Sequence, residues 1–396
     1  GRIRKVIRSF FAPKETSWVL EVLPGEVRAT SLVLDTEKRI QIRRHWQGES
    51  WRDLPKSFRF TGQVIVSIHA TLATTTIIPV GDMRENPDEP LVANELENLI
   101  SRAVGKIFNQ CRQAAARELR VDEIDIFLAK SRVINFKLDD HVVLNPVGFR
   151  AEKIEAVLEL MLTTRPLIGE LKQLFKERRE IFFTQTERAI LLDLEKLHGP
   201  PLGLLELGEE SFFFLMEKAA VGEMLSRGKF NWSPQMLLHA LAGELSVSGG
   251  AARKIYHAFL RGEVSANMGK HIKKALDPQL KLFYEELGRT RLRGKVFVLS
   301  GLPLPISLPQ KRQNLILSEP PLTPMLDHFG LALAPYRPET CRRPFEVLAP
   351  WLEFYLDKSD SKINQWLRRH LNWLGPVHES QAGPGQRQIK LPFLEQ

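Results

Sequence analysis

Two glycine-turned β-hairpins, one near the start of the chain and one near its middle, constrain the fold more than any other feature. Residues 17–34 (SWVLEVLPGEVRATSLVL) place two β-rich runs around Pro24-Gly25, a pair that favours a tight turn. Residues 202–216 form a second strand pair of the same kind. Between them, residues 91–120 change to a helical period, with apolar side chains recurring on one side. Strands and helices interspersed in this way predict an α/β protein.

The rest of the chain continues this mixed pattern. A helix is predicted after Pro166, and residues 217–288 are mostly helical in pattern. At 396 residues the chain is long enough for two or more domains with sizeable cores, so several subdomains are expected. Further strands are predicted over residues 59–80, 123–129, 132–138, 141–160, 180–195 and 295–308.

Composition narrows the class of protein. The chain is 43% hydrophobic and 26% charged, which is typical of a globular protein and not of a disordered one. Its formal net charge of +9 favours an anionic partner: nucleic acid, anionic lipid or an acidic protein. Only two cysteines occur, far apart, which argues against a disulfide framework and favours a reducing cytoplasm. No apolar run approaches the roughly 20 residues that span a bilayer, and no signal peptide is visible. Because the chain begins at Gly1, the completeness of its N-terminus stays open.

In the order of its elements, the chain resembles the actin-like ATPase superfamily. In that superfamily an opening hairpin, a second glycine-turned hairpin and a late strand ending in Ser-Gly hold the nucleotide. Within it, the sequence is similar to the bacterial cell-division protein family FtsA: Asn145, Pro146, Val147 and Gly148 match a signature stretch of that family. The helix over residues 91–120 lies where the family's inserted subdomain begins. The resemblance implies an α/β, actin-like (ribonuclease H-like) two-lobed fold with an inserted small α/β subdomain of the SHS2 type.

This resemblance divides the chain into segments. They are a basic amphipathic N-terminal segment (1–16), the first lobe in two parts (17–90 and 166–200), the inserted subdomain (91–165), the second lobe (201–345), and a C-terminal linker with an amphipathic helix (346–396).

The positions at which the family holds nucleotide are altered in this sequence. The first loop lacks a hydroxyl, and in the second loop Glu209 and Glu210 stand where the family has glycines. Two carboxylates repel a polyphosphate, so we expect no ATP hydrolysis and no catalytic residue, and ATP with Mg²⁺ stays an open cofactor. No histidine or cysteine spacing suits a metal site. The degenerate nucleotide-site positions are Glu21, Gly25, Glu206, Gly208, Ser211, Ser300 and Gly301.

Both ends of the chain carry basic amphipathic patterns. On a helix, residues 361–374 place tryptophan and leucine on one side and arginine beside them, the make-up of an interfacial membrane helix. The FtsA family has a membrane-targeting helix at the same place; a helix docked on the protein core is the alternative. The N-terminal pattern also fits a targeting remnant or a basic arm for nucleic acid. The predicted membrane-binding residues are Ile363, Trp366, Leu367, Arg368, Arg369, Leu371, Trp373 and Leu374, with Ile3, Val6, Ile7, Phe10 and Phe11.

The leading hypothesis is a non-enzymatic, FtsA-like adaptor that tethers filaments of the tubulin-like FtsZ, or other cell-division proteins, to the inner face of the cytoplasmic membrane. The family also implies self-association into filaments. One alternative is a PilM-like cytoplasmic component of type IV pilus assembly, which shares the insert but has no amphipathic tail. The other is a polymerising actin homologue that still binds ATP. Nucleic-acid binding is a further hypothesis, and only the net charge supports it. The expected docking residues for an acidic peptide are Arg253, Lys254, Lys270, Lys273 and Lys274.

Overall fold

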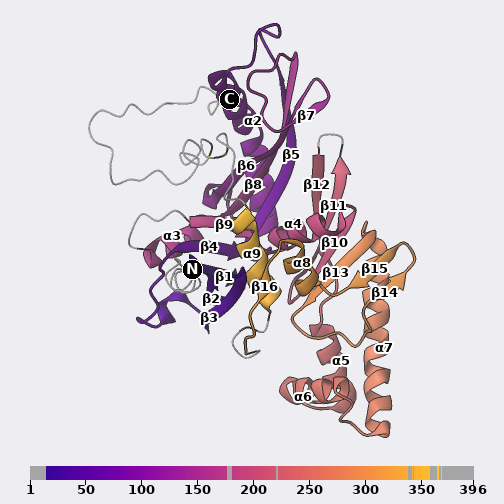
Figure 1. The fold of residues 1–396 in the computed structure, drawn as a ribbon. Coiled ribbons are helices and arrows are strands. Elements are labelled where there is room, and N and C mark those ends of the chain that lie inside the picture. The colour runs from indigo at the N-terminus through magenta and orange to yellow at the C-terminus, as the bar shows by residue number, and fades with distance from the viewer. Residues whose placement is uncertain are drawn as a thin grey trace, which may run out of the picture.

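The structure, a computed structural model, consists of two lobes and an insert that projects from the first lobe (Figure 1). It describes residues 15–175, 181–219, 222–337, 341, 343–356, 364 and 367. The predicted membrane-binding residues Ile3, Val6, Ile7, Phe10 and Phe11 lie outside the described residues.

The first lobe is built on a six-stranded sheet with the strand order β16-β3-β2-β1-β4-β9. β1 and β2 form the predicted opening hairpin, in which Val22 lies opposite Val27 and Gly25 takes the positive φ of +68° that the turn requires. β4 and β9 add in parallel on the other side of β1. The strands are β1 (Glu15–Leu23), β2 (Glu26–Leu34), β3 (Arg39–Gly48), β4 (Gln63–Ile68), β9 (Ile181–Gln185) and β16 (Ala332–Leu333).

The second lobe repeats the arrangement of five of these strands, whereas its sixth strand lies at the opposite edge of the sheet. Its sheet has the order β12-β11-β10-β13-β15-β14, again with an antiparallel hairpin and third strand on one side and two parallel strands on the other. The two-lobed α/β architecture predicted from the sequence is confirmed. The strands are β10 (Leu202–Leu207), β11 (Ser211–Ala219), β12 (Gly222–Phe230), β13 (Gly294–Ser300), β14 (Gln310–Arg312) and β15 (Leu315–Ser318).

The insert begins earlier than residue 91, the boundary predicted from the sequence. Its antiparallel sheet, of order β5-β8-β6-β7, starts at Ala73, because β5 pairs with β8 from Ala73 opposite Thr163 to Met83 opposite Lys153. The predicted helix is α2 (Ala93–Leu119), which packs on this sheet through Leu96, Leu99 and neighbouring apolar residues. The strands are β5 (Ala73–Met83), β6 (Ile126–Leu138), β7 (His141–Val143) and β8 (Lys153–Thr164).

Two helices, α4 (Thr186–His198) and α9 (Pro344–Leu356), lie between the lobes (Figure 1). One buried cluster joins them to both sheets, from Val19 and Ile65 in the first lobe to Leu204 and Phe214 in the second. The strand pair predicted over residues 180–195 is therefore wrong beyond β9, and the linker predicted from residue 346 begins instead as a buried helix.

The second lobe also carries a helical subdomain, formed by α5 (Gln235–Leu245), α6 (Gly249–Leu260) and α7 (Ala266–Arg289), at the end of the molecule away from β7 (Figure 1). The hydroxyls of Ser248 and Ser265 cap α6 and α7 by accepting from the N–H groups of Ala251 and Met268. None of the helices in the described part of the chain has the length and apolar character that crossing a bilayer requires. The remaining short elements are α3 (Arg165–Leu174), α8 (Leu322–His328), η1 (Trp51–Asp53) and η2 (Glu123–Asp125).

A buried ion cluster fixes the insert to the body of the protein. Lys130 on β6 lies 3.2 Å from Glu159 on β8 and pairs with Glu353 on α9, while Arg188 on α4 lies 3.1 Å from Glu159. Burial alone raises the pKa of Glu159, but Lys130 and Arg188 hold it below its usual range. The ring of Phe182 lies 4.8 Å from the Lys130 ammonium. These contacts join the insert to α4 and α9, so it is not a loosely attached domain.

Candidate functional site

Charged side chains from both lobes meet where the parallel strands end. Glu21 lies on β1, His69 follows β4, and Glu206 lies on β10. Ligands of α/β sheets bind beyond the carboxyl ends of such strands, which makes this place the candidate site. We call the group formed by Glu21, Arg28, His69, Glu187, Glu206, Arg343 and Glu346 the interlobe junction.

Two arginines lie in the interlobe junction. Arg28 on β2 places Nη1 3.6 Å from Glu21 Oε1 and 3.4 Å from Glu346 Oε2. Arg343, just before α9, places Nη1 2.5 Å from Glu346 Oε1. Burial raises the pKa of Glu21 to about 8, against the opposing effect of Arg28. At neutral pH Glu21 is therefore largely protonated.

A histidine and two acidic side chains form a second group in the interlobe junction. His69 Nε2 lies 3.3 Å from Glu187 Oε1 and 3.8 Å from Glu206 Oε1. The N–H of Ala70 donates to the same Glu187 oxygen at 3.1 Å. Burial alone lowers the pKa of His69, yet Glu187 and Glu206 raise it to about 9. A protonated imidazole thus serves as the counter-ion of these carboxylates at neutral pH.

In the turn between β10 and β11, the polar groups that could bind phosphate contact other residues of the protein. The N–H of Gly208, the kind of group that holds a phosphate in glycine loops, points to Ser211 Oγ at 3.3 Å. The two carboxylate oxygens of Glu210 each lie 3.4 Å from the guanidinium of Arg120, at the end of α2. The predicted residues Glu206, Gly208 and Ser211 do lie together, but they form no open phosphate loop.

At the end of β13, Ser300 and Gly301 also contact other residues of the protein. Ser300 Oγ donates to the carbonyl of Leu302 at 2.5 Å, and the N–H of Gly301 donates to the carbonyl of Leu207 at 3.1 Å. A Cβ placed on Gly301 would meet Arg343 Nη2 at 3.1 Å. The guanidinium of Arg343 therefore lies directly against the glycine that the sequence predicted as a nucleotide contact.

These residues do not fit a complex of Mg²⁺ with ATP. A polyphosphate needs free N–H donors and cations, and Mg²⁺ needs free carboxylate oxygens. In the interlobe junction the Gly208 N–H faces a hydroxyl, Arg28 and Arg343 are both paired with Glu346, and His69 is paired with Glu187 and Glu206. Among the described residues, no group of three histidine, cysteine or acidic side chains is arranged to hold a metal ion.

Sequence reasoning missed the cations of the interlobe junction. Arg28, His69 and Arg343 were not predicted, nor were Glu187 and Glu346. One signal was available: His69 interrupts the apolar run of β4 and its turn (VIVSIHA), where a charged residue needs a buried partner. The predicted Gly25 forms the hairpin turn itself, and apart from its two chain neighbours no described residue lies within 4 Å of where its Cβ would be.

Comparisons with known proteins found matches only among solved structures. No protein-family model matches the chain, and no curated protein sequence does. The chain is similar to the PilM–PilN type IV pilus biogenesis complex, with a TM-score of 0.44 and 13% identity over 87% of this chain and 97% of that chain. It is similar to the cytoplasmic domain of EpsL, an inner-membrane component of the type II secretion system of Vibrio cholerae, with a TM-score of 0.25 and 15% identity over 58% and 75% of the two chains. A glucokinase from an Antarctic psychrotroph matches with a TM-score of 0.27 and 10% identity over 86% and 99%.

The topology of the two sheets decides the fold class. Each lobe has one hairpin, one antiparallel third strand and two parallel strands in the same order, with α4 and α9 between the lobes. The fold is actin-like. Within it, the chain carries its insert between the fourth and fifth strands of the first lobe.

Arg227 on β12 ties the second lobe of the actin-like body to the first. Its guanidinium donates to the carbonyls of Ala70 at 2.6 Å and Ala73 at 3.3 Å, and to Glu118 Oε2 on α2 at 3.1 Å. It also lies 4.5 Å from the ring centroid of Phe212. Together with Arg120 and Glu210, this contact joins the second lobe to the start of the insert.

The predicted membrane helix requires a correction at Leu367. This side chain has no exposed surface and belongs to the apolar core of the insert, with Leu96 and Val133. Asn364, which is 3% exposed, accepts from the N–H of Val133 at 2.7 Å and donates to its carbonyl at 3.0 Å. Leu367 therefore cannot contact lipid while it is docked here. The other predicted positions, Ile363, Trp366, Arg368, Arg369, Leu371, Trp373 and Leu374, lie outside the described residues.

The residues predicted to dock an acidic peptide lie on the helical subdomain. Arg253 and Lys254 on α6 and the lysines of α7 are all exposed. Lys274 Nζ lies 3.0 Å from Glu244 Oε1, while His271 Nδ1 lies 3.9 Å from the same oxygen. The exposure of Arg253, Lys254, Lys270, Lys273 and Lys274 suits a contact surface, and no described contact assigns a partner to it.

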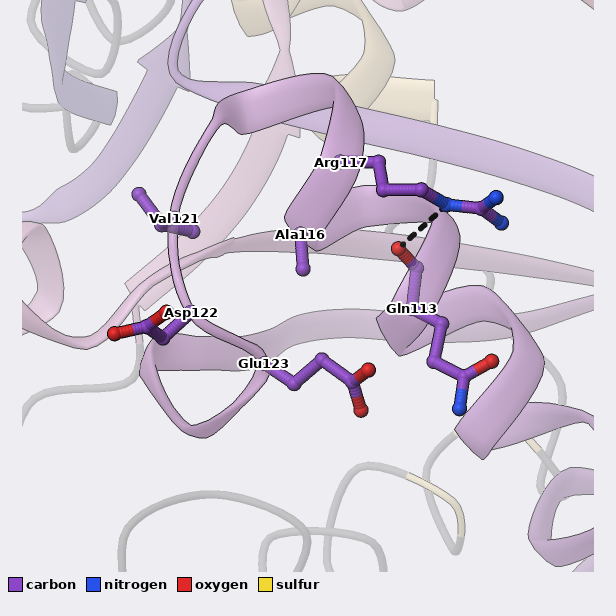
Figure 2. Close-up of a pocket in the computed structure, with 6 residues that line it drawn as sticks. All are labelled: Gln113, Ala116, Arg117, Val121, Asp122 and Glu123. Carbon is purple, nitrogen blue, oxygen red and sulfur yellow. Dashed lines mark hydrogen bonds between the residues drawn. The ribbon is translucent and has the colours of Figure 1, made fainter.

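A separate pocket of about 500 Å³ lies at the end of α2 (Figure 2). Arg117 Nε donates to the carbonyl of Gln113 at 3.4 Å, and Glu123 lies 3.5 Å from Arg112. The pocket is open, and the charged side chains at its edge have opposite signs, so it lacks the enclosed, convergent polar groups of a ligand site. Its lining residues are Gln113, Ala116, Arg117, Val121, Asp122 and Glu123.

Proposed function

We propose that this protein is a non-catalytic actin-like scaffold of a membrane-associated assembly of the pilus or secretion class, and that it neither hydrolyses nor requires ATP. The observation that carries the proposal is the interlobe junction, where the chain's own arginines and histidine pair with the carboxylates. In this arrangement internal cations take the place that a nucleotide and its metal would have, and they hold the two lobes in one relative position.

Inserting a nucleotide into this junction is electrostatically unfavourable. The carboxylates of Glu206 and Glu346 are nearly fully buried, at 6% and 5% exposure, and would repel a polyphosphate at low effective dielectric. The arginines become available to phosphate only when their pairs break. Breaking one partner from a buried ion pair costs about 3–5 kcal/mol, so a nucleotide would have to offset more than one such loss.

The docking of Asn364 and Leu367 supports the pilus or secretion class over the cell-division adaptor. The two hypotheses differ in whether residues 361–374 form a free lipid-binding helix, and Leu367 is part of the core of the insert. The PilM–PilN complex serves type IV pilus biogenesis, and the EpsL cytoplasmic domain belongs to an inner-membrane component of a type II secretion system. By analogy, we propose a membrane-anchored partner for this chain.

Titration with ATP and Mg²⁺ tests the non-catalytic part of the proposal. We expect no heat of binding by calorimetry and no change in the midpoint of thermal unfolding at millimolar ATP. A ligand at 100 times its dissociation constant would stabilise the protein by about 2.7 kcal/mol, which would raise the midpoint by several degrees. Such a rise would overturn this part of the proposal.

Deletion of the gene in its host tests the cellular part. We expect loss of surface pili or of protein secretion with normal cell length. Elongated cells without septa would support the cell-division hypothesis instead and overturn the assignment to a pilus or secretion assembly.

An adaptor that docks an acidic peptide is the second candidate, because the basic side chains of α6 and α7 are exposed. Under this hypothesis, Lys270→Glu together with Lys273→Glu should abolish binding of an acidic FtsZ-type tail peptide, measured by fluorescence anisotropy. The matched control is Lys281→Glu, further along α7 and paired with Glu285 at 4.0 Å. Equal binding by all three proteins would remove this candidate.

A further inference from the structure

One end of the insert exposes an unusual number of large apolar side chains. Six of the eleven large apolar side chains that are exposed in the described part of the chain lie here. Solvent-exposed apolar groups that gather in one place mark interaction surfaces. We call this group the insert tip; its members and exposed fractions are Leu144 (91%), Val142 (63%), Val92 (57%), Met83 (53%), Phe149 (53%) and Val147 (37%).

The insert tip is held rigidly by the buried side chain of Arg84. Its guanidinium donates to both oxygens of Glu95 at 2.8 and 2.9 Å, and to the carbonyls of Glu89 at 2.8 Å and Ala151 at 3.3 Å. The side-chain amide of Asn145 also organises the loop, because Oδ1 accepts from the N–H of Val147 at 3.1 Å. A surface that is already ordered loses little conformational entropy on binding, which is the property of a prepared docking site.

Backbone contacts bring the two exposed segments of the insert tip together. The N–H of Leu91 donates to the carbonyl of Phe149 at 2.8 Å, and the N–H of Gly148 donates to the carbonyl of Leu91 at 2.8 Å. Val92 therefore adjoins Phe149, although the two residues are 57 positions apart in the sequence.

Acidic side chains border the insert tip. Glu85, Asp88 and Glu89 are exposed on the loop that leads from β5 to α2, and Arg150 is the exposed cation beside Phe149. The surface thus combines apolar groups with a net negative rim. A complementary segment must carry apolar side chains together with several basic ones.

The chain itself contains such a segment at residues 1–14 (GRIRKVIRSFFAPK), which lies outside the described residues. Its basic members are Arg2, Arg4, Lys5, Arg8 and Lys14, and its apolar members include Ile3, Val6, Ile7, Phe10 and Phe11. We propose that the insert tip binds residues 1–14 of a second copy of this chain.

The geometry favours a second copy over the same chain. The first described residue, Glu15, starts β1, while the insert is attached after the opposite end of the parallel strand β4. The nine residues of β1, which starts at Glu15, span about 30 Å at 3.3 Å per residue. The eleven residues of β5, which ends at the insert tip, add about 36 Å. Fourteen residues reach only about 46 Å even when fully extended at 3.3 Å per residue, which is shorter than these two strands laid end to end.

Sedimentation velocity of the full chain tests the proposal. We expect concentration-dependent association, weakened about ten-fold by Arg4→Glu with Arg8→Glu, and to a similar extent by Glu85→Lys with Asp88→Lys. Combining the two pairs of charge reversals should restore association, because the new charges are again complementary. Leu144→Ser with Phe149→Ser should weaken association, whereas the control Leu282→Ser, an exposed apolar residue on α7, should not.

Three outcomes would overturn the proposal. The first is a chain that stays monomeric at every concentration, and the second is association that the charge reversals leave unchanged. The third is that Arg4→Glu with Arg8→Glu abolishes retention on vesicles containing anionic phosphatidylserine but leaves association intact, which would assign residues 1–14 to lipid. Restored association in the variant that combines both pairs of charge reversals would support the proposal. If either pair only disturbed the structure, combining the two would not restore association.

Discussion

At the scale of single residues, two groups of the interlobe junction hold protons in an unusual pH range. Burial raises the pKa of Glu21 to about 8. For His69, burial acts in the opposite direction, but Glu187 and Glu206 raise the pKa to about 9. The folded chain therefore binds protons that the unfolded chain has released, so the contribution of both groups to stability falls as pH rises. For His69 it is complete below about 6.5 and is lost as pH rises through about 9; for Glu21 the loss runs from about 4.5 to 8.

The first prediction concerns Glu21→Gln, which replaces the buried carboxyl by a group that cannot ionise. Between pH 6.5 and 8 the free energy of unfolding of the natural chain should fall, by up to about 1.4 kcal/mol per pH unit for each proton involved. In the variant this fall should be shallower, and the variant should be the more stable protein near pH 8.5. Urea unfolding across this range measures it, with the exposed Glu37→Gln as control. Parallel curves for all three proteins would mean that Glu21 does not titrate there.

At the scale of elements, Asn364 acts as a short substitute for a strand at the edge of β6. Its side-chain amide satisfies both the N–H and the carbonyl of Val133, which would otherwise be unpaired at this edge. Leu367, three positions further, fills the core of the insert. The insert therefore depends on a segment more than 200 positions away in sequence, which local patterns do not reveal.

The second prediction is that Leu367→Ala and Asn364→Ala each destabilise the insert. Leu367→Ala should cost about 2–4 kcal/mol through the cavity it leaves, and Asn364→Ala about 1–3 kcal/mol through unpaired backbone groups. In Asn364→Ala the amide of Val133 should exchange with deuterium much faster, as measured by NMR. Leu144→Ala, at an exposed position, is the matched control and should change stability by less than about 0.5 kcal/mol. Unchanged exchange at Val133 would contradict the assigned role of Asn364.

The elements that sequence reasoning found and those that it missed differ in burial. The opening hairpin and α2 were predicted because a glycine turn and a one-sided apolar stripe are local signals. α4 and α9 were missed because they are buried almost all round, so they lack the contrast between two faces on which a helical pattern depends.

The residues of the candidate site were also predicted only in part. Glu21, Glu206 and Gly208 were found because they lie beside hairpin turns with a known role in similar folds. Their cationic partners were missed, because an ion pair such as that of Arg28 and Glu346 joins positions 318 residues apart. The sequence also predicted a lipid contact for Leu367 from its amphipathic stripe; the same stripe serves equally well for docking on the insert, and only the tertiary structure distinguishes the two.

At the scale of the whole molecule, buried charges and a shared core unite two lobes and an insert. Lys130 is central, because it lies between Glu159 of the insert and Glu353 of α9. The third prediction is that Lys130→Met destabilises the protein by about 3–5 kcal/mol, since it leaves buried carboxylates without their partner. Lys137→Met, on the same strand and paired with the exposed Asp140, is the control and should cost little. Urea unfolding measures both, and similar values for the two variants would contradict the ion cluster's role.

The last prediction concerns the connection between the lobes through Arg227. Arg227→Met keeps the aliphatic part of the side chain but leaves the carbonyls of Ala70 and Ala73 without this donor, at a cost of about 1–3 kcal/mol for each group. Because Lys cannot reproduce several guanidinium contacts at once, Arg227→Lys should restore only part of the loss.

Hydrogen exchange followed by mass spectrometry locates the effect of Arg227→Met. Faster exchange is expected in residues 70–73 and in β12, with α5 to α7 unchanged, since those helices have their own core. Arg261→Met, which removes a pair with Glu263 on the surface of the helical subdomain, is the control and should leave residues 70–73 unaffected. If Arg227→Met also leaves them unaffected, the shared core around α4 and α9 and the interlobe junction hold the lobes together without Arg227, and its polar contacts contribute nothing to the fixed geometry that a scaffold requires.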